Sequence, residues 1–156
     1  MRQLLGRTLV TLALGCFAGL HAFAQTPLPA ATNLAQHGSA SARQGAPLIM
    51  LVSVDGCSFC EKIRRQHLAP LQKAGAIVYQ IHLDSDAALT DFAGAPTTQR
   101  ALAQKLAVKA APTVLFFNAR GIQVAEPIVG ALIDDFYAGY LDQAILTAKK
   151  ALSPRS

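Results

Sequence analysis

The chain has three cysteines, and two of them, Cys57 and Cys60, lie three positions apart in the stretch VSVDGCSFCEKIRR. An apolar run precedes this pair, and a stretch with the period of an amphipathic helix follows it. Such a pair has three explanations: a redox dithiol, half of a metal site, or two small core residues that lie close by chance. The elements around the pair decide among them.

The positions of the two cysteines favour redox chemistry. Leu48–Val54 is a continuous apolar run, typical of a strand buried on both faces. We expect a helix to begin near Cys57 and to be bent or interrupted near Pro70. Free backbone N–H groups and the helix dipole stabilise a thiolate at a helix N-terminus. Cys57 is therefore the expected nucleophile, and Cys60, one turn deeper, is the expected resolving thiol.

Metal and haem sites fit the pattern less well. A structural zinc site needs four ligands, but the chain has no second CxxC motif, and His67 and His82 are isolated. Copper binding by the two sulfurs lacks an obvious nearby histidine, and covalent haem attachment needs histidine where the chain has Glu61. We expect no metal and no organic cofactor, because the dithiol itself carries the electrons. His67 is interpreted as a packing residue, and His82 is assigned no role.

The N-terminal residues predict export. Residues 1–24 begin with Arg2 and Arg7, continue with a short apolar run and end in the small-residue pattern AFAQ, typical of a cleaved signal peptide. The alternative is a lipoprotein signal in which Cys16 is lipidated, although the bulky Leu14 disfavours it. If Cys16 is removed, only the CxxC pair remains. A disulfide that closes so short a loop stabilises a fold little, which favours a chemical role.

Length and charge limit the function further. The chain of 156 residues is long enough for one domain with its own core after removal of the signal peptide. Its net charge is +5, but no run of Lys and Arg exceeds two residues, so we expect no nucleic-acid partner. Residues 25–47 are rich in Ala, Ser, Gly, Pro and Gln and are interpreted as a flexible lead-in with room for one helical turn. The folded domain then covers residues 48–150, and residues 151–156 form a C-terminal tail.

The remaining patterns predict an α/β fold with the element order β-α-β-α-β-β-α. We expect the first two strands to be parallel and the last two to be antiparallel. After the helix that carries the cysteines, the expected elements are a strand over Ile77–Leu83, a polar excursion over 84–96, a helix over Thr97–Val108, strands over Thr113–Phe117 and Ile122–Ala125, and a last helix over 131–150.

Three motifs together carry a resemblance to a known family. They are GCSFC after an apolar strand, VKAAPTVLFFNARG about fifty residues later, and IVGALIDDFYAGYLDQAI near the end. The chain resembles the thioredoxin superfamily over residues 48–150, and is most similar to exported bacterial thioredoxin-like thiol–disulfide oxidoreductases, including periplasmic ones associated with sulfur oxidation. The resemblance implies a thioredoxin fold, with a central mixed β-sheet flanked by helices. Unlike housekeeping thioredoxins, the chain has no Trp and no acidic residue in the strand before the dithiol.

The resemblance also implies an activity and further site residues. The family's cis-proline, which faces the dithiol, corresponds to Pro112, and Ala111 beside it would pair with an extended substrate. We expect the apolar ring of Phe59 to contact partner proteins. The implied protein is a periplasmic enzyme that exchanges its Cys57–Cys60 dithiol with protein thiols and disulfides, more in the reductase direction, and that takes electrons from a membrane electron donor protein. The alternatives are a disulfide oxidase or isomerase, and a binding or chaperone module whose disulfide is structural.

Overall fold

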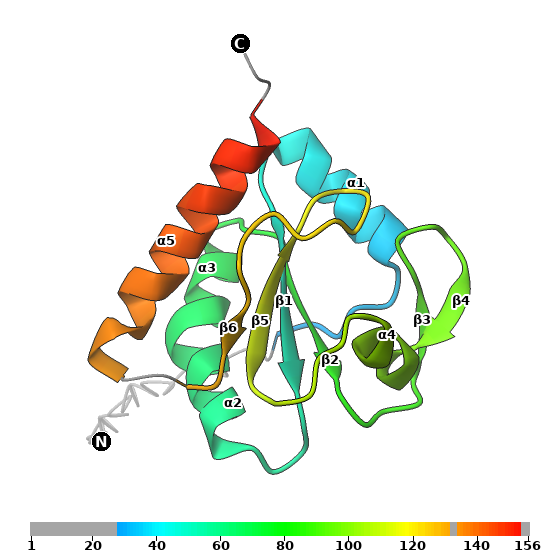
Figure 1. Ribbon diagram of the computed structural model, residues 1–156, viewed down its shortest axis with the longest axis horizontal. Helices are drawn as coiled ribbons and strands as arrows, with labels where there is room; N and C mark the ends of the chain where they lie inside the picture. Colours follow the sequence, from blue (N-terminus) through cyan, green and yellow to red (C-terminus); the bar gives the residue numbers. More distant parts are fainter. Residues whose placement is uncertain (1–27, 132–133, 154–156) are drawn as a thin grey trace, which may run out of the picture.

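The computed structural model of the protein describes residues 28–131 and 134–153 (Figure 1). The predicted signal peptide over residues 1–24, with Cys16, lies outside this range. Within it, no helix is long and apolar enough to cross a membrane. The elements in chain order are α1 (Leu34–Gln44), β1 (Leu48–Ser53), α2 (Ser58–Ile63), the π-helical segment η1 (Arg64–Leu68), α3 (Ala69–Lys73), β2 (Val78–His82), β3 (Ala88–Thr90), β4 (Pro96–Thr98), α4 (Gln99–Lys105), β5 (Thr113–Phe117), β6 (Ile128–Val129) and α5 (Asp134–Leu152).

A mixed sheet forms the centre of the molecule, with the strand order β2-β1-β5-β6. Strand β1 pairs in parallel with β2 and antiparallel with β5, and β5 pairs antiparallel with β6. The predicted α/β class, with a parallel first pair and an antiparallel last pair of strands, is confirmed. Strand β1 thus occupies an interior position and pairs along both of its edges.

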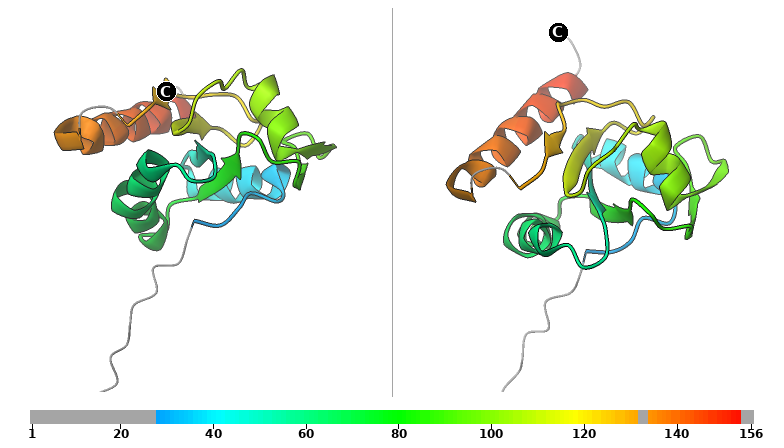
Figure 2. Two further views of the ribbon diagram at one scale, coloured as in Figure 1. Left: turned by 90° about the horizontal axis from the view of Figure 1, so that it is seen from below. Right: turned by 60° about the horizontal axis from the view of Figure 1, so that its bottom comes forward.

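Helices cover both faces of this sheet, and every residue of β1 is accordingly buried. Alternate side chains of a strand point to opposite faces. Leu48, Met50 and Val52 belong to one core cluster, together with side chains from α1 and α4. Ile49 and Leu51 belong to the other, together with side chains from α2, η1 and α5. Figures 1 and 2 show these two groups of helices on opposite sides of the strands.

The helix that follows the cysteines is interrupted, as predicted near Pro70. Segment η1 has the wider π-helical hydrogen bonding, and the N–H of Ala69 donates to the carbonyl of Arg64, five residues earlier. Proline has no N–H, and its ring crowds the preceding helical turn. The π segment, which ends two residues before Pro70, accommodates that ring without ending the helix.

The interpretation of residues 25–47 as a flexible lead-in is wrong for residues 34–44, which form helix α1. The side chain of Asn33 caps this helix by accepting a 3.0 Å hydrogen bond from the N–H of Gln36. Leu28 and Leu34 are buried in the two core clusters. The segment is rich in small residues, so its local pattern is weak, and burial against the sheet stabilises the helix instead.

Two other segments also differ from the prediction. The polar excursion over 84–96 contains strand β3, which pairs with β4 in a separate hairpin. The carboxylate of Asp91 stabilises its turn by accepting 2.9 Å hydrogen bonds from the N–H groups of Ala93 and Ala95.

The predicted strand over Ile122–Ala125 is reduced to one isolated bridge, and the strand that pairs with β5 is β6. The side chain of Asn118 accepts the N–H of Ile122, which holds that stretch in a loop.

Glycine substitutions test whether α1 is packed as part of the domain. A Cβ atom on Gly38 in α1 would lie 2.7 Å from the backbone oxygen of Ala119, whereas a Cβ on Gly139 in α5 meets no atom within 4 Å. We expect Gly38→Ala to lower the free energy of unfolding by about 1–3 kcal/mol through overpacking. The matched change Gly139→Ala should raise it by up to about 1 kcal/mol, because alanine favours a helix interior. Urea unfolding measures both, and a Gly38→Ala protein as stable as Gly139→Ala would contradict the packing of α1.

Candidate active site

The two cysteines form a disulfide at the start of α2, with their Cα atoms 5.2 Å apart. Cys57 is the N-cap of α2, and its sulfur accepts a 3.0 Å hydrogen bond from the N–H of Cys60. Cys60 is only 1% exposed, whereas Cys57 is partly exposed. A sulfur at this position receives the free N–H groups of the first helical turn, as the sequence predicts for the nucleophile.

Local backbone geometry explains this placement. Strand β1 ends at Ser53, and Gly56 adopts a positive φ of 69°, which favours glycine and turns the chain into the helix. The N–H of Glu61 then donates to the carbonyl of Cys57 at 3.0 Å, which closes the first helical turn. The cysteine pair is therefore held between a buried strand and a capped helix.

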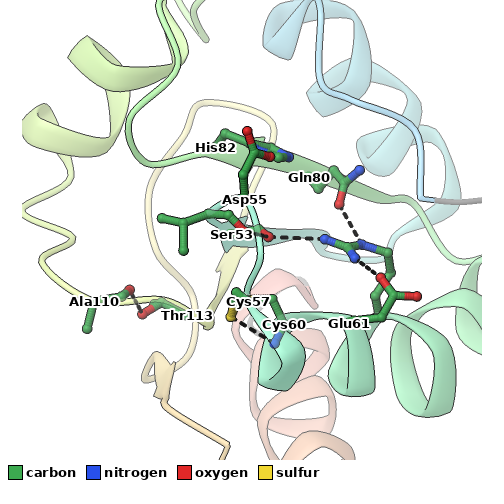
Figure 3. Close-up of a disulfide and its surroundings, with 11 residues drawn as sticks. Ser53, Asp55, Cys57, Cys60, Glu61, Gln80, His82, Ala110 and Thr113 are labelled. Atoms are coloured by element: carbon green, nitrogen blue, oxygen red, sulfur yellow. Dashed lines mark hydrogen bonds and ion pairs between the residues drawn. A yellow bond between two sulfur atoms is a disulfide. The ribbon is translucent and has the colours of Figure 1, made fainter.

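The Ala111–Pro112 segment lies at the same end of the sheet as the disulfide. Its peptide bond is cis. Pro112 is buried, and its carbonyl accepts a 2.8 Å hydrogen bond from the N–H of Gly130. The next residue, Thr113, opens β5 and pairs with Val52 near the end of β1. The hydroxyl of Thr113 donates a 2.8 Å hydrogen bond to the carbonyl of Ala110, just before the cis bond (Figure 3).

The third predicted contact residue, Phe59, lies between the cysteines and is 61% exposed. An apolar ring of this size gains little by facing water, and a partner surface could cover it. The structure therefore brings the dithiol, the exposed ring and the proline segment to one region of the molecule.

A polar cluster beside Cys57 is absent from the sequence-based prediction (Figure 3). The guanidinium of Arg64 donates to Gln80 Oε1 at 2.8 Å and to Ser53 Oγ at 3.0 Å, and it forms an ion pair with Glu61. These side chains adjoin an open pocket of about 450 Å³, which is lined by Val54, Asp55, Gly56, Cys57, Ser58, Glu61, Arg64, Gln80 and His82. No local pattern in the sequence indicates this cluster, because its members come from four separate elements.

His82, for which the sequence predicts no role, also lines this pocket, and its Nδ1 lies 3.1 Å from Asp55 Oδ1. A sequence signal for this pair exists. Strands β1 and β2 are parallel, so residues at or just beyond their C-terminal ends meet at one edge of the sheet.

His67, by contrast, packs against Tyr137 with ring centroids 4.7 Å apart and does not line the pocket. Burial raises the pKa of Tyr137, which keeps its hydroxyl neutral.

The arrangement is suited to thiol–disulfide exchange. When the disulfide is reduced, one sulfur is reachable by a partner and the other is shielded within reach of the first. Among the described residues, no group of three or more His, Cys, Asp or Glu side chains could hold a metal ion.

Several solved structures share this fold. Mitochondrial thioredoxin 3 from Saccharomyces cerevisiae in its oxidized form is 19% identical, with coverage of 76% of this chain and 93% of that chain and a TM-score of 0.51. Thioredoxin O2 from Arabidopsis thaliana in its oxidized state is 18% identical, with coverage of 75% and 93% and a TM-score of 0.51. A mutant thioredoxin from Halobacterium salinarum NRC-1 is 21% identical, with coverage of 78% and 92% and a TM-score of 0.51. At this identity the likeness concerns the fold, which is the predicted thioredoxin fold.

No curated protein sequence matches the chain significantly. Residues 36–145, however, match the family described as thioredoxin-like domain. This match spans both cysteines, the proline segment and most of α5, and with the Cys57–Cys60 disulfide it supports a thiol–disulfide oxidoreductase. The chain belongs to the thioredoxin-like domain family.

Proposed function

We propose that the protein is an exported thiol–disulfide reductase of the bacterial periplasm that reduces disulfides in partner proteins. The observation that carries this proposal is the unequal exposure of the two sulfurs at the start of α2. The signal peptide pattern over residues 1–24 supports the compartment. The resemblance to periplasmic thioredoxin-like proteins, including those associated with sulfur oxidation, supports the reductase direction.

The reaction is two successive exchanges. The thiolate of Cys57 attacks a partner disulfide, forms a mixed disulfide and releases the first partner thiolate, which takes up a proton. The thiolate of Cys60 then attacks the Cys57 sulfur and releases the second partner thiolate. Two electrons pass to the partner, and the protein is left with its own Cys57–Cys60 disulfide, the state seen in the structure.

Each turnover therefore requires an electron donor. A dithiol donor regenerates Cys57 and Cys60 by the reverse pair of exchanges, so no metal or organic cofactor is needed within the protein. In an exported protein, this donor is proposed to be a membrane protein that passes electrons across the inner membrane to the periplasm. Phe59, Ala111 and Pro112 form the proposed surface for an extended segment of the partner, which would pair with the backbone beside Ala111.

The reduction potential of the Cys57–Cys60 pair tests the direction of the reaction. We expect a value near that of thioredoxin, roughly −270 mV, when the protein is equilibrated against glutathione or dithiothreitol buffers. A value near −120 mV would assign the protein as an oxidase instead. Mass spectrometry after acid quenching and alkylation measures the fractions of reduced and oxidised protein in each buffer.

Limited alkylation tests the assignment of the nucleophile. In the reduced protein we expect iodoacetamide to modify Cys57 at least about tenfold faster than Cys60, because Cys57 is accessible and lies at the helix terminus. Peptide mapping after short exposure at pH 7 measures the two rates, and full unfolding in denaturant is the control that should equalise them. Faster modification of Cys60 in the folded protein would reverse the two roles.

Partner trapping tests whether exchange involves proteins. We expect Cys60→Ala to accumulate mixed disulfides through Cys57, because the resolving thiol is missing. The matched variant Cys57→Ala should accumulate none, since its remaining sulfur is buried. Non-reducing electrophoresis of the exported fraction detects the adducts. If Cys60→Ala captures no protein, the disulfide belongs to a binding or chaperone module and not to a reductase.

A further inference from the structure

Arg64 connects the dithiol helix to two strands of the sheet. Its Nε donates to Gln80 in β2 at 2.8 Å, its Nη2 donates to Ser53 in β1 at 3.0 Å, and its Nη1 pairs with Glu61 in α2. The side chain is only 14% exposed. A planar guanidinium can satisfy three acceptors in fixed directions, which the ammonium of lysine cannot reproduce. All three nitrogens of the largely buried guanidinium therefore have an acceptor, and together these contacts hold the first turn of α2 in place.

The charge on Glu61 bears directly on Cys57. Cys57 is the N-cap residue of α2, and Glu61 lies four positions later, within the helix. Both residues line the 450 Å³ pocket. An unpaired carboxylate beside a cysteine disfavours the thiolate, whereas a nearby cation favours it. The ion pair with Arg64 offsets the carboxylate at this position.

Other charged groups lie near Glu61 or line the same pocket as Cys57. Asp55 and His82 pair with each other at the same pocket. Arg65 lies 3.5 Å from the other oxygen of Glu61 and is 58% exposed, and Lys62 is a neighbour of Glu61 in α2. Replacing Arg64 leaves these four side chains in the sequence, so a comparison of variants reports on the side chain of Arg64.

We propose that Arg64 is a positioning residue that sets the reactivity of the Cys57 thiolate, by neutralising Glu61 and by holding the first turn of α2 against β1 and β2. The Cys60 N–H, which donates to the Cys57 sulfur, belongs to that turn. This inference deepens the proposed function and rests on its assignment of Cys57 as the nucleophile. It concerns the charge and the contacts of one side chain and leaves the dithiol chemistry itself unchanged.

The test is the pH dependence of iodoacetamide alkylation at Cys57 in the reduced, full-length protein. In this reaction the thiolate sulfur forms a bond to carbon and iodide leaves, so no protein partner is required. We expect Arg64→Met to shift the midpoint of the curve of alkylation rate against pH to higher pH. The same variant should slow alkylation at pH 7 about three- to tenfold. Arg64→Lys should recover part of the rate, because it restores the charge but not the three directed contacts of the guanidinium.

A double variant separates the charge of Glu61 from the fold. Glu61→Gln alone should speed alkylation at pH 7, because Arg64 is then left as an unopposed cation. Glu61→Gln combined with Arg64→Met should return the midpoint near that of the unmodified protein. If the double variant stays as slow as Arg64→Met, the slow alkylation does not come from the charge of Glu61, and the proposed neutralisation of Glu61 by Arg64 is overturned.

Arg65→Met is the matched control, because it removes the same charge from the next residue in the chain. Arg65 is exposed and contacts Glu61, but it makes no contact with β1 or β2 like those of Arg64. We expect it to change the alkylation rate less than about twofold, as an exposed ion pair contributes little. Equal effects of Arg64→Met and Arg65→Met, or a lower melting temperature for Arg64→Met with an unchanged pH midpoint, would overturn the proposal. Because alkylation needs no substrate protein, such a result leaves the proposed reductase standing. A protein that fails to reduce disulfides but shows the expected pH shifts would refute the reductase and support the role of Arg64.

Discussion

The complete burial of strand β1 is the constraint on which the site depends. A buried backbone must have its N–H and C=O groups paired, so β1 requires a neighbour on each edge. Strand β2 is the parallel neighbour, and β5 is the antiparallel one. The C-terminal end of β1 therefore lies beside the end of β2 and the beginning of β5. The dithiol follows β1 after a short turn, which places it at the edge that also carries Pro112.

The same geometry explains the polar cluster at the start of the helix. Strand β1 ends in Ser53, whose hydroxyl is small and uncharged. The charge at this end of β1 comes from Arg64, at the first position of the π segment. This segment precedes Pro70, and its wider helical turn accommodates the proline ring. The same segment places Arg64 beside Ser53. π segments are frequent at functional sites, and this one begins with a side chain that lines the same pocket as Cys57.

The N-terminal segment is connected to this cluster through Gln80. The side-chain amide of Gln80 donates to the carbonyl of Leu28 at 2.8 Å while its oxygen accepts from Arg64. Backbone hydrogen bonds from Ala31 to Gln80 and from Gln80 to Pro29 place the segment along the outer edge of β2. The folded domain therefore includes residues well before β1, and these residues support the strand that holds Arg64.

The sequence alone determined the elements with strong local patterns and the chemistry that lies within one short motif. The apolar run of β1, the CxxC pair at the start of α2 and the interruption near Pro70 all follow from residues close together in the chain. Tertiary structure decided the rest. Helix α1 is stabilised by burial and not by its own pattern, and β6 is defined by its pairing with β5. The contacts of Arg64 join residues from strands and a helix far apart in sequence, and the pairing of Asp55 with His82 depends on two strands ending together. Local periodicity records which face of an element is buried, but it does not record which other element covers that face, and this is why the cysteines could be predicted and the contacts of Arg64 could not.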